Sequence, residues 1–182
     1  MAKFPHVDFK VTWRPFFLDP TMPEDGRDKK EWYTLKFGEA RMQQVLPRMI
    51  QVFDNVGLKY SLGGKTGSTM NSHRLIQWAG TVDLKKQDAL VEELFKNYFT
   101  EEKFLNDRDV LLHAVKVAGL DEAEGARIID DPSLWRKEVE DDIKKHARGV
   151  SGVPNFTFQN KLKISGGQPP EVFEEVIEEI VG

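Results

Sequence analysis

The chain has 182 residues, 40% hydrophobic and 31% charged, so it can bury a core as one domain or as one domain with a large insertion. Its 26 basic and 30 acidic residues give a formal net charge of -4, which excludes a broad basic field for nucleic acid or an anionic membrane surface. The chain contains no cysteine, which excludes disulfides and cysteine-bound zinc.

The first predicted element is a strand at residues 9–18, "FKVTWRPFFL", where apolar and polar side chains alternate until Pro15. A loop rich in proline, glycine and charge follows at 19–31. Before the strand, the start "MAKFPHVDFK" lacks the apolar stretch of a signal peptide, and no run approaches the roughly 18 apolar residues of a membrane span. We therefore expect a cytoplasmic location.

Apolar residues at helical spacing predict that the region 31–149 is almost wholly helical. Aspartate, asparagine and glycine mark helix starts and ends within it. The expected helices run over 39–55 with a kink at Pro47, from Ser68 or Thr69 to Trp78, from Asp83, from Asn106 to Gly119, from Asp121, and from Asp131 to Gly149.

The last predicted elements are a hairpin and a helix. The stretches "VPNFTF" and "KLKIS" alternate around Gln159 and Asn160, which favours two antiparallel strands. Pro169 and Pro170 can begin a final helix. Its apolar residues, expected to face inward, are Val172, Phe173, Val176, Ile177 and Ile180.

Three apparent sites have plain structural explanations. The segment "LGGKTGS" at 62–68 resembles a phosphate loop, but that pattern needs a glycine where Lys59 stands. The four histidines lack metal-ligand spacing: His6, His73, His113 and His146. The acidic cluster Glu138, Glu140, Asp141 and Asp142 lies at helical spacing from Lys144 and Lys145, which is typical of a solvated helix face.

A more specific signal joins segments that lie far apart in the sequence. Taken in order, these segments resemble the FrnE-like branch of the DsbA family, and the similarity covers essentially the whole chain. The matching segments are Trp13-Arg14-Pro15-Phe16, Thr69 with His73-Arg74-Leu75, residues 89–102, Gly152-Val153-Pro154, and residues 167–173 from Gly167 and Gln168 onward. Ser68 departs from the asparagine that is usual in this branch.

The resemblance implies an α/β fold, namely a thioredoxin-like fold interrupted by a helical subdomain. Residues 1–20 and 150–182 would form the thioredoxin-like part, and 21–149 the helical insertion. It also implies a cis peptide bond before Pro154, which would turn the backbone N–H and C=O of Val153 outward. An extended peptide, or a small thiol such as glutathione, could then pair with Val153 as an added strand.

The resemblance further implies substrate-facing residues from three regions. Gly152, Val153 and Pro154 would offer the backbone edge, while Trp13, Arg14 and Pro15 would form a wall beside it. His73 and Arg74 would face the site from the helical cap, and the alternative is that both are surface residues of an amphipathic helix. Gly167 and Gln168 would lie at the N-terminus of the last helix.

The absence of cysteine departs from the family pattern. Family members carry Cys-x-x-Cys on an N-terminal strand and helix, and the resemblance implies that this element, roughly 30 residues, is lacking. Its strand would lie between residues 9–18 and the hairpin, so we expect these two either to close up or to leave an open groove. Without a thiol, the polypeptide alone cannot form a mixed disulfide.

Three functions follow from this reasoning. The first is a member of the thiol-disulfide oxidoreductase family that is redox-inactive by itself and has no catalytic residue in this chain. The second is a glutathione-dependent enzyme like kappa-class transferases or 2-hydroxychromene-2-carboxylate isomerase, with the tripeptide along Val153 and Pro154 and a carboxylate near Gly167 and Gln168. The third is a peptide-binding module without chemistry. No metal or resident cofactor is expected, and we also consider a homodimer.

Overall fold

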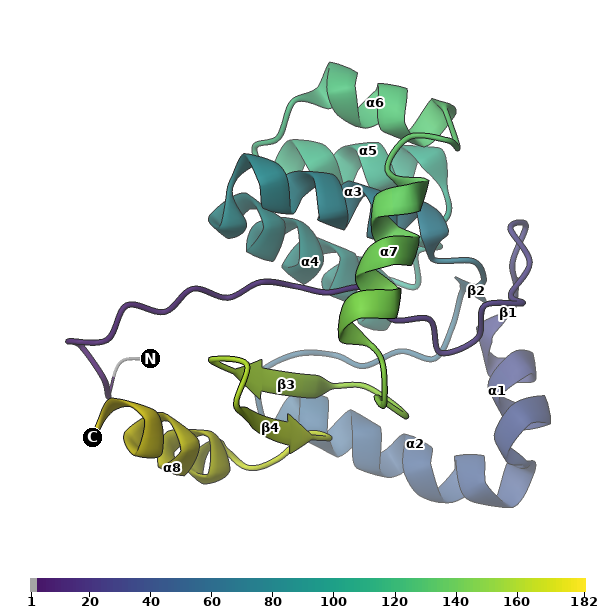
Figure 1. Cartoon of the computed structure of the whole chain (residues 1–182). Helices are drawn as coiled ribbons and strands as arrows, with labels where there is room; N and C mark the ends of the chain where they lie inside the picture. Colours follow the sequence, from purple (N-terminus) through teal and green to yellow (C-terminus); the bar gives the residue numbers. More distant parts are fainter. Residues whose placement is uncertain (1–2) are drawn as a thin grey trace.

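In the computed structural model, the described residues are 3–182. The elements follow in the order β1 (Arg27–Asp28), α1 (Lys29–Phe37), α2 (Glu39–Asp54), β2 (Lys65–Thr66), α3 (Met70–Val82), α4 (Leu84–Phe99), α5 (Arg108–Val117), α6 (Glu122–Asp130), α7 (Arg136–His146), β3 (Asn155–Phe158), β4 (Leu162–Ser165) and α8 (Pro170–Val181). Figure 1 shows α3, α4, α5 and α6 grouped together, with α7 running from this group toward the β3–β4 hairpin. Among these residues, no helix has the length and apolar character needed to cross a bilayer.

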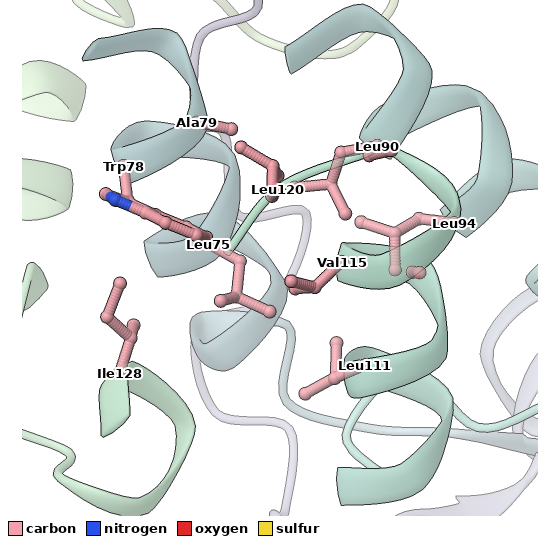
Figure 2. Packing of buried hydrophobic residues seen from close by; sticks show 11 residues of the cluster. Leu75, Trp78, Ala79, Leu90, Leu94, Leu111, Val115, Leu120 and Ile128 are labelled. Atoms are coloured by element: carbon pink, nitrogen blue, oxygen red, sulfur yellow. The ribbon is translucent and has the colours of Figure 1, made fainter. Parts of the chain in front are cut away.

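The hydrophobic core lies within the group of helices (Figure 2). Leu75 and Ala79 of α3, Leu90 of α4 and Leu111 of α5 have no solvent exposure. Their spacing of three or four residues along each helix puts them on one face, so the faces of neighbouring helices can pack together. The other buried members of this cluster are Trp78, Leu94, Ala114, Val115, Ala118, Leu120 and Ile128.

Aspartates begin several of these helices by accepting hydrogen bonds from first-turn N–H groups. Asp83 accepts from Lys85 at the start of α4, and Asp121 accepts from Glu124 at the start of α6, as expected from the sequence. The cap of α5 is Asp107 and not the expected Asn106. The side-chain amide of Asn106 instead donates to the carbonyl of Glu24 at 2.9 Å.

Helix α7 begins later than expected. The side chain of Asp131 accepts from the Ser133 N–H at 3.0 Å, and this turn continues until Trp135, whose φ of 62° is not helical. The helix therefore starts at Arg136 and ends at His146, three residues before Gly149. Helix α3 is longer than expected at its C-terminal end, because it continues through Gly80 to Val82 instead of ending at Trp78.

The prediction of a strand at 9–18 is wrong. The segment is extended but forms no ladder within residues 3–182, which contain two separate two-stranded antiparallel sheets, β1–β2 and β3–β4. Figure 1 shows this purple segment passing beside α4 as an isolated extended chain. Alternation of side chains indicates an extended backbone, but a strand also needs a neighbouring strand to hydrogen-bond it. Segment 9–18 and β3 have therefore not closed up into one sheet.

The hairpin and the last helix form where the sequence places them. Gln159 and Asn160 have positive φ angles of 51° and 57°, and Lys161 N–H donates to the Phe158 carbonyl at 2.9 Å. The ring of Phe173 in α8 packs against Phe156 with a centroid distance of 4.8 Å. No residue of α8 is buried, so its apolar face is only half-covered, contrary to expectation.

The glycine-rich segment 62–68 packs against the turn at residues 100–102. Lys65 and Thr66 form β2, which pairs with β1. Gly64 has a φ of +79°, and a Cβ there would collide with the carbonyl oxygen of Glu102. The Ser61 hydroxyl donates to the carboxylate of the same glutamate. Close packing thus accounts for this glycine, and it agrees with the interpretation of the segment as a structural loop.

Candidate functional site

The loop before β3 presents unpaired backbone groups. The Val153–Pro154 peptide bond is cis, and Val153 is 47% exposed. Among the described residues, neither the N–H nor the C=O of Val153 has a hydrogen-bond partner. The next carbonyl, that of Pro154, accepts from the Gly166 N–H at 2.8 Å and so joins the hairpin. Backbone pairing in the hairpin therefore begins at Pro154, and the backbone groups of Val153, the residue before it, are free to bind another chain.

Along β3, the backbone hydrogen-bonding groups point alternately toward β4 and away from it. In an antiparallel pair, every second residue directs its N–H and C=O to the partner strand, and the residues between direct theirs away. Pro154 bonds to Gly166, so Phe156 and Phe158 also point their backbone groups toward β4. Asn155 and Thr157 point theirs to the other edge, and Val153, just before the ladder, has both backbone groups unpaired. Within residues 3–182, no strand pairs with that edge, which we call the free β3 edge.

The free β3 edge is supported from one face by α8. Phe156 and Phe158 lie on the same face of β3, and both contact Phe173. Ile164 of β4 is 6% exposed. These contacts hold the hairpin against α8, so the backbone groups of the free edge are presented on a supported strand and not on a mobile loop.

Trp13 is held by α4 and not by a strand. The Trp13 N–H donates to Gln87 Oε1 at 3.0 Å, and Gln87 Nε2 donates to the Trp13 carbonyl at 3.2 Å. The indole Nε1–H donates to Asp88 at 2.8 Å. Gln87 is only 2% exposed. The wall expected from Trp13 is therefore attached to the helical group.

Arg14 connects the same segment to α7. Its guanidinium lies 3.0 Å from Asp142 Oδ1, which also lies 2.6 Å from His146 Nδ1. The side chain of Asp142 is only 7% exposed, so its expected place on a solvated face is wrong. Asp142 faces the N-terminal segment, because Arg14 of that segment contacts its carboxylate. Pro15, the next residue of the segment, is buried. The segment carrying Trp13 and Arg14 is thus tied to two helices.

The structure separates Arg74 from the free β3 edge. Arg74 has no solvent exposure, and its guanidinium donates to the carbonyls of Ile128, Asp131 and Leu134. These carbonyls belong to the end of α6 and the turn that follows it. Arg74 therefore has the geometry of a residue that stabilises this turn, and it does not face the extended segment.

His73 lies between α3 and the N-terminal segment. Its Nδ1 is 2.7 Å from the Thr69 carbonyl, so Nδ1 carries the proton because a carbonyl oxygen can only accept. The ring meets Phe17 edge-on with a centroid distance of 4.9 Å. Burial lowers the pKa of His73, which favours the neutral imidazole. His73 thus packs beneath Phe17 and is not a surface residue of the helix.

Gly167 and Gln168 precede α8, where a carboxylate of glutathione was expected. Gln168 Nε2 donates to the Ser165 carbonyl at 3.0 Å. Pro169 and Pro170 have no N–H, and the Val172 N–H already donates to the Pro169 carbonyl at 3.1 Å. The first turn of α8 therefore offers only the Glu171 N–H, beside an acidic side chain. This is a poor anion site for a helix N-terminus.

Several residues of this region were not found from the sequence. Gln87 and Asp88 hold Trp13 across 74 and 75 residues of chain, and no local pattern indicates such a contact. Asp142 and His146 are four residues apart on α7, a spacing that predicts proximity but not burial. Across residues 3–182, no group of three histidine, aspartate or glutamate side chains is arranged to hold a metal ion.

Comparisons with known proteins agree with this geometry. The family model of the DSBA-like thioredoxin domain matches residues 2–178. Among solved structures, the chain is similar to the crystal structure of a probable DsbA oxidoreductase from Streptomyces coelicolor, with a TM-score of 0.83 and 29% sequence identity over 91% of this chain and 73% of that chain. No curated protein matches significantly. The thioredoxin-like fold with inserted helices, expected from the sequence, is thereby confirmed.

Proposed function

This chain belongs to the family of DSBA-like thioredoxin domains, and from that premise we propose that it binds an extended peptide along the free β3 edge. The observation that carries the proposal is the unpaired N–H and C=O of Val153, continued by the outward backbone groups of Asn155 and Thr157. An extended peptide can pair with these groups as a third strand, and main-chain hydrogen bonds then supply affinity.

The proposed role is binding without thiol chemistry. Thiol-disulfide exchange requires a thiolate, and these 182 residues contain no cysteine. The chain would therefore bind an extended segment of a substrate protein, as an oxidoreductase of this family does. The thiol for any disulfide exchange would have to be supplied by another polypeptide segment or molecule. We place Gly152, Val153 and Pro154 at the centre of the site, with Trp13, Arg14 and Pro15 as its wall.

We also propose the division of the chain that the sequence suggested. Residues 1–20 and 150–182 would form the thioredoxin-like part, and residues 21–149 the helical part. Two observations support the division. The main buried cluster draws only on residues between Leu75 and Ile128, and the hairpin has its own apolar contact with α8 through Phe173.

The test uses a matched pair of proline variants. The Thr157 N–H points to the free β3 edge, whereas the Lys163 N–H points to the outer edge of β4, because these two residues face each other as a pair without mutual backbone bonds. Neither Thr157→Pro nor Lys163→Pro removes a hydrogen bond between the two strands. We expect Thr157→Pro to weaken peptide binding and Lys163→Pro to leave it nearly unchanged.

Binding is measured by NMR titration with a ten-residue, cysteine-free peptide of valine and threonine that is amidated at its C-terminus. The expected result is a set of chemical-shift changes at Val153, Asn155 and Thr157. Changes confined to β4, or none at any peptide concentration, would contradict the proposal. Sedimentation measurements precede the titration, because a homodimer that covers β3 would also contradict it. Glutathione serves as a second ligand, and shifts at both Val153 and Gly167 with glutathione, but none with the peptide, would favour the transferase-like alternative.

A further inference from the structure

A hollow of about 520 Å³ lies between the N-terminal segment and the end of α7. Apolar side chains provide most of its wall, and Lys144 and Arg148 stand beside them. The apolar members are Phe16, Phe17, Pro20, Ile143 and Ala147. Its lining residues belong to the N-terminal segment and to the end of α7. Figure 1 shows these two backbone segments passing each other near the loop that leads to β3.

Of the charged side chains that line the hollow, Lys144 has an ion pair and Arg148 has none within the described residues. Asp141 is paired with Lys137 and, at 3.2 Å, with Lys144. Asp142 is paired with Arg14 and His146 on the other side of α7. Within the described part of the chain, Arg148 has neither an ion pair nor a side-chain hydrogen bond. A planar guanidinium beside an apolar wall is well suited to a carboxylate, because its N–H groups match both carboxylate oxygens.

The hollow is within reach of a peptide on the free β3 edge. Arg148 and Val153 are five residues apart, and five residues span at most about 18 Å even when fully extended. A bound peptide in extended conformation covers the same distance with five or six residues. One ligand can therefore pair with Val153 and place a side chain against Phe16 and Phe17.

We propose that this hollow is a side-chain subsite that selects peptides with a bulky apolar residue next to an aspartate or glutamate. The apolar side chain would lie against Phe16, Phe17 and Ile143, and the neighbouring carboxylate would pair with Arg148. The inference rests on the proposed function and deepens it, because it names the class of peptide that the same edge takes.

The test compares two amidated peptides that differ at one position. Both carry a valine- and threonine-rich strand followed by leucine, and the next residue is aspartate in one and asparagine in the other. We expect the aspartate peptide to bind about fivefold more tightly in low salt, as measured by isothermal titration calorimetry. The preference should shrink in high salt, because an exposed ion pair is screened.

Variants of Arg148 assign the preference to this residue. Arg148→Gln should remove the aspartate preference, so that the aspartate and asparagine peptides bind this variant equally. Arg148→Glu should reverse the preference toward a peptide with lysine at that position. Lys161→Gln, in the exposed turn between β3 and β4, is the matched control and should keep the preference. Replacing the leucine of the peptide by serine should weaken binding to every variant.

The outcomes separate this inference from the proposed function. Equal affinity for the aspartate and asparagine peptides would overturn the subsite while leaving peptide binding intact. An aspartate preference that survives Arg148→Gln would also overturn it, as would a dependence on Arg148 that appears only with a free C-terminal carboxylate. Absence of binding by every peptide would overturn the proposed function itself.

Discussion

The side-chain amide of Gln87 hydrogen-bonds both backbone polar groups of Trp13, accepting from its N–H at 3.0 Å and donating to its C=O at 3.2 Å. A residue of a neighbouring strand would make the same two bonds in an antiparallel sheet. A single glutamine of α4 therefore replaces a strand at this point. It explains how the segment can stay extended although no strand pairs with it.

Gln87→Leu should lower the free energy of unfolding by about 1–3 kcal/mol, because it leaves the partly buried N–H and C=O of Trp13 without partners. Urea denaturation measures the loss, and amide hydrogen exchange should become faster at Trp13. Gln44→Leu, at an exposed position of α2, is the control. If both variants lose the same stability, the bond from Gln87 to Trp13 has no special role.

Asp141 and Asp142 should respond differently to the same substitution. Asp142→Asn should lower the free energy of unfolding by about 1–2 kcal/mol, because the buried side chain loses its charged contacts with Arg14 and His146. Asp141→Asn should leave stability nearly unchanged, since its ion pairs are exposed. Thermal and urea denaturation compare the two.

A double-mutant cycle shows whether Arg14 is the partner of Asp142. In the Asp142→Asn background, Arg14→Gln should cost much less stability than it does in the unmodified chain. Equal costs in both backgrounds would contradict the described tie between the N-terminal segment and α7.

Arg74→Lys should lower the free energy of unfolding by about 2–4 kcal/mol, because lysine cannot reach several carbonyls with a planar fork. Arg108→Lys is the matched control, since Arg108 makes an exposed pair with Asp130. It should leave stability nearly unchanged. If Arg74→Lys instead retains full stability and loses peptide binding, Arg74 belongs to the site and not to the turn after α6.

Lys29 should make stability depend on pH above neutrality. Its side chain is buried and donates to the Tyr98 carbonyl at 2.6 Å, and burial lowers its pKa to about 8 from the ordinary 10.5. Between these values the unfolded state binds more protons, so the free energy of unfolding rises with pH over this window. The contribution is complete above 10.5 and is lost as pH falls through about 8.

Lys29→Met should remove this part of the pH dependence. Urea denaturation at intervals from pH 7 to pH 10 gives the slope for the unmodified chain and the variant, and Lys30→Met, at the exposed neighbouring position, is the control. If the slope were the same in all three proteins, the pKa of Lys29 would not differ between the folded and the unfolded state, and the prediction would be wrong.

Short-range chemistry accounts for the parts of the fold that the sequence predicted well. Asp83 and Asp121 cap α4 and α6 through bonds to N–H groups two or three residues away. The hairpin turns at Gln159 and Asn160, because both residues adopt positive φ between two alternating stretches. In each case the residues that interact are neighbours in the chain, so the pattern contains the whole interaction.

The candidate site was predicted less completely, because its contacts join distant residues. The sequence indicated Val153 and Pro154 through a resemblance that spans the chain, and the open backbone of Val153 agrees with it. It could not show that Arg74 turns away to the end of α6, since helical spacing alone does not say which side of α3 is covered. Which residues belong to the site therefore depends on how the helices and the hairpin pack against one another.

By itself, the sequence determined most of the helices, the caps at Asp83 and Asp121, the hairpin, and the lack of cysteine in these 182 residues, all of which depend on residue type and local spacing. Only the tertiary structure decided that, among residues 3–182, segment 9–18 pairs with no strand and Arg148 has no ion pair, and that Asp142 is buried while Asp141 is exposed. These properties depend on which distant atoms come within hydrogen-bond distance or exclude water. Residue order specifies them only through the complete fold.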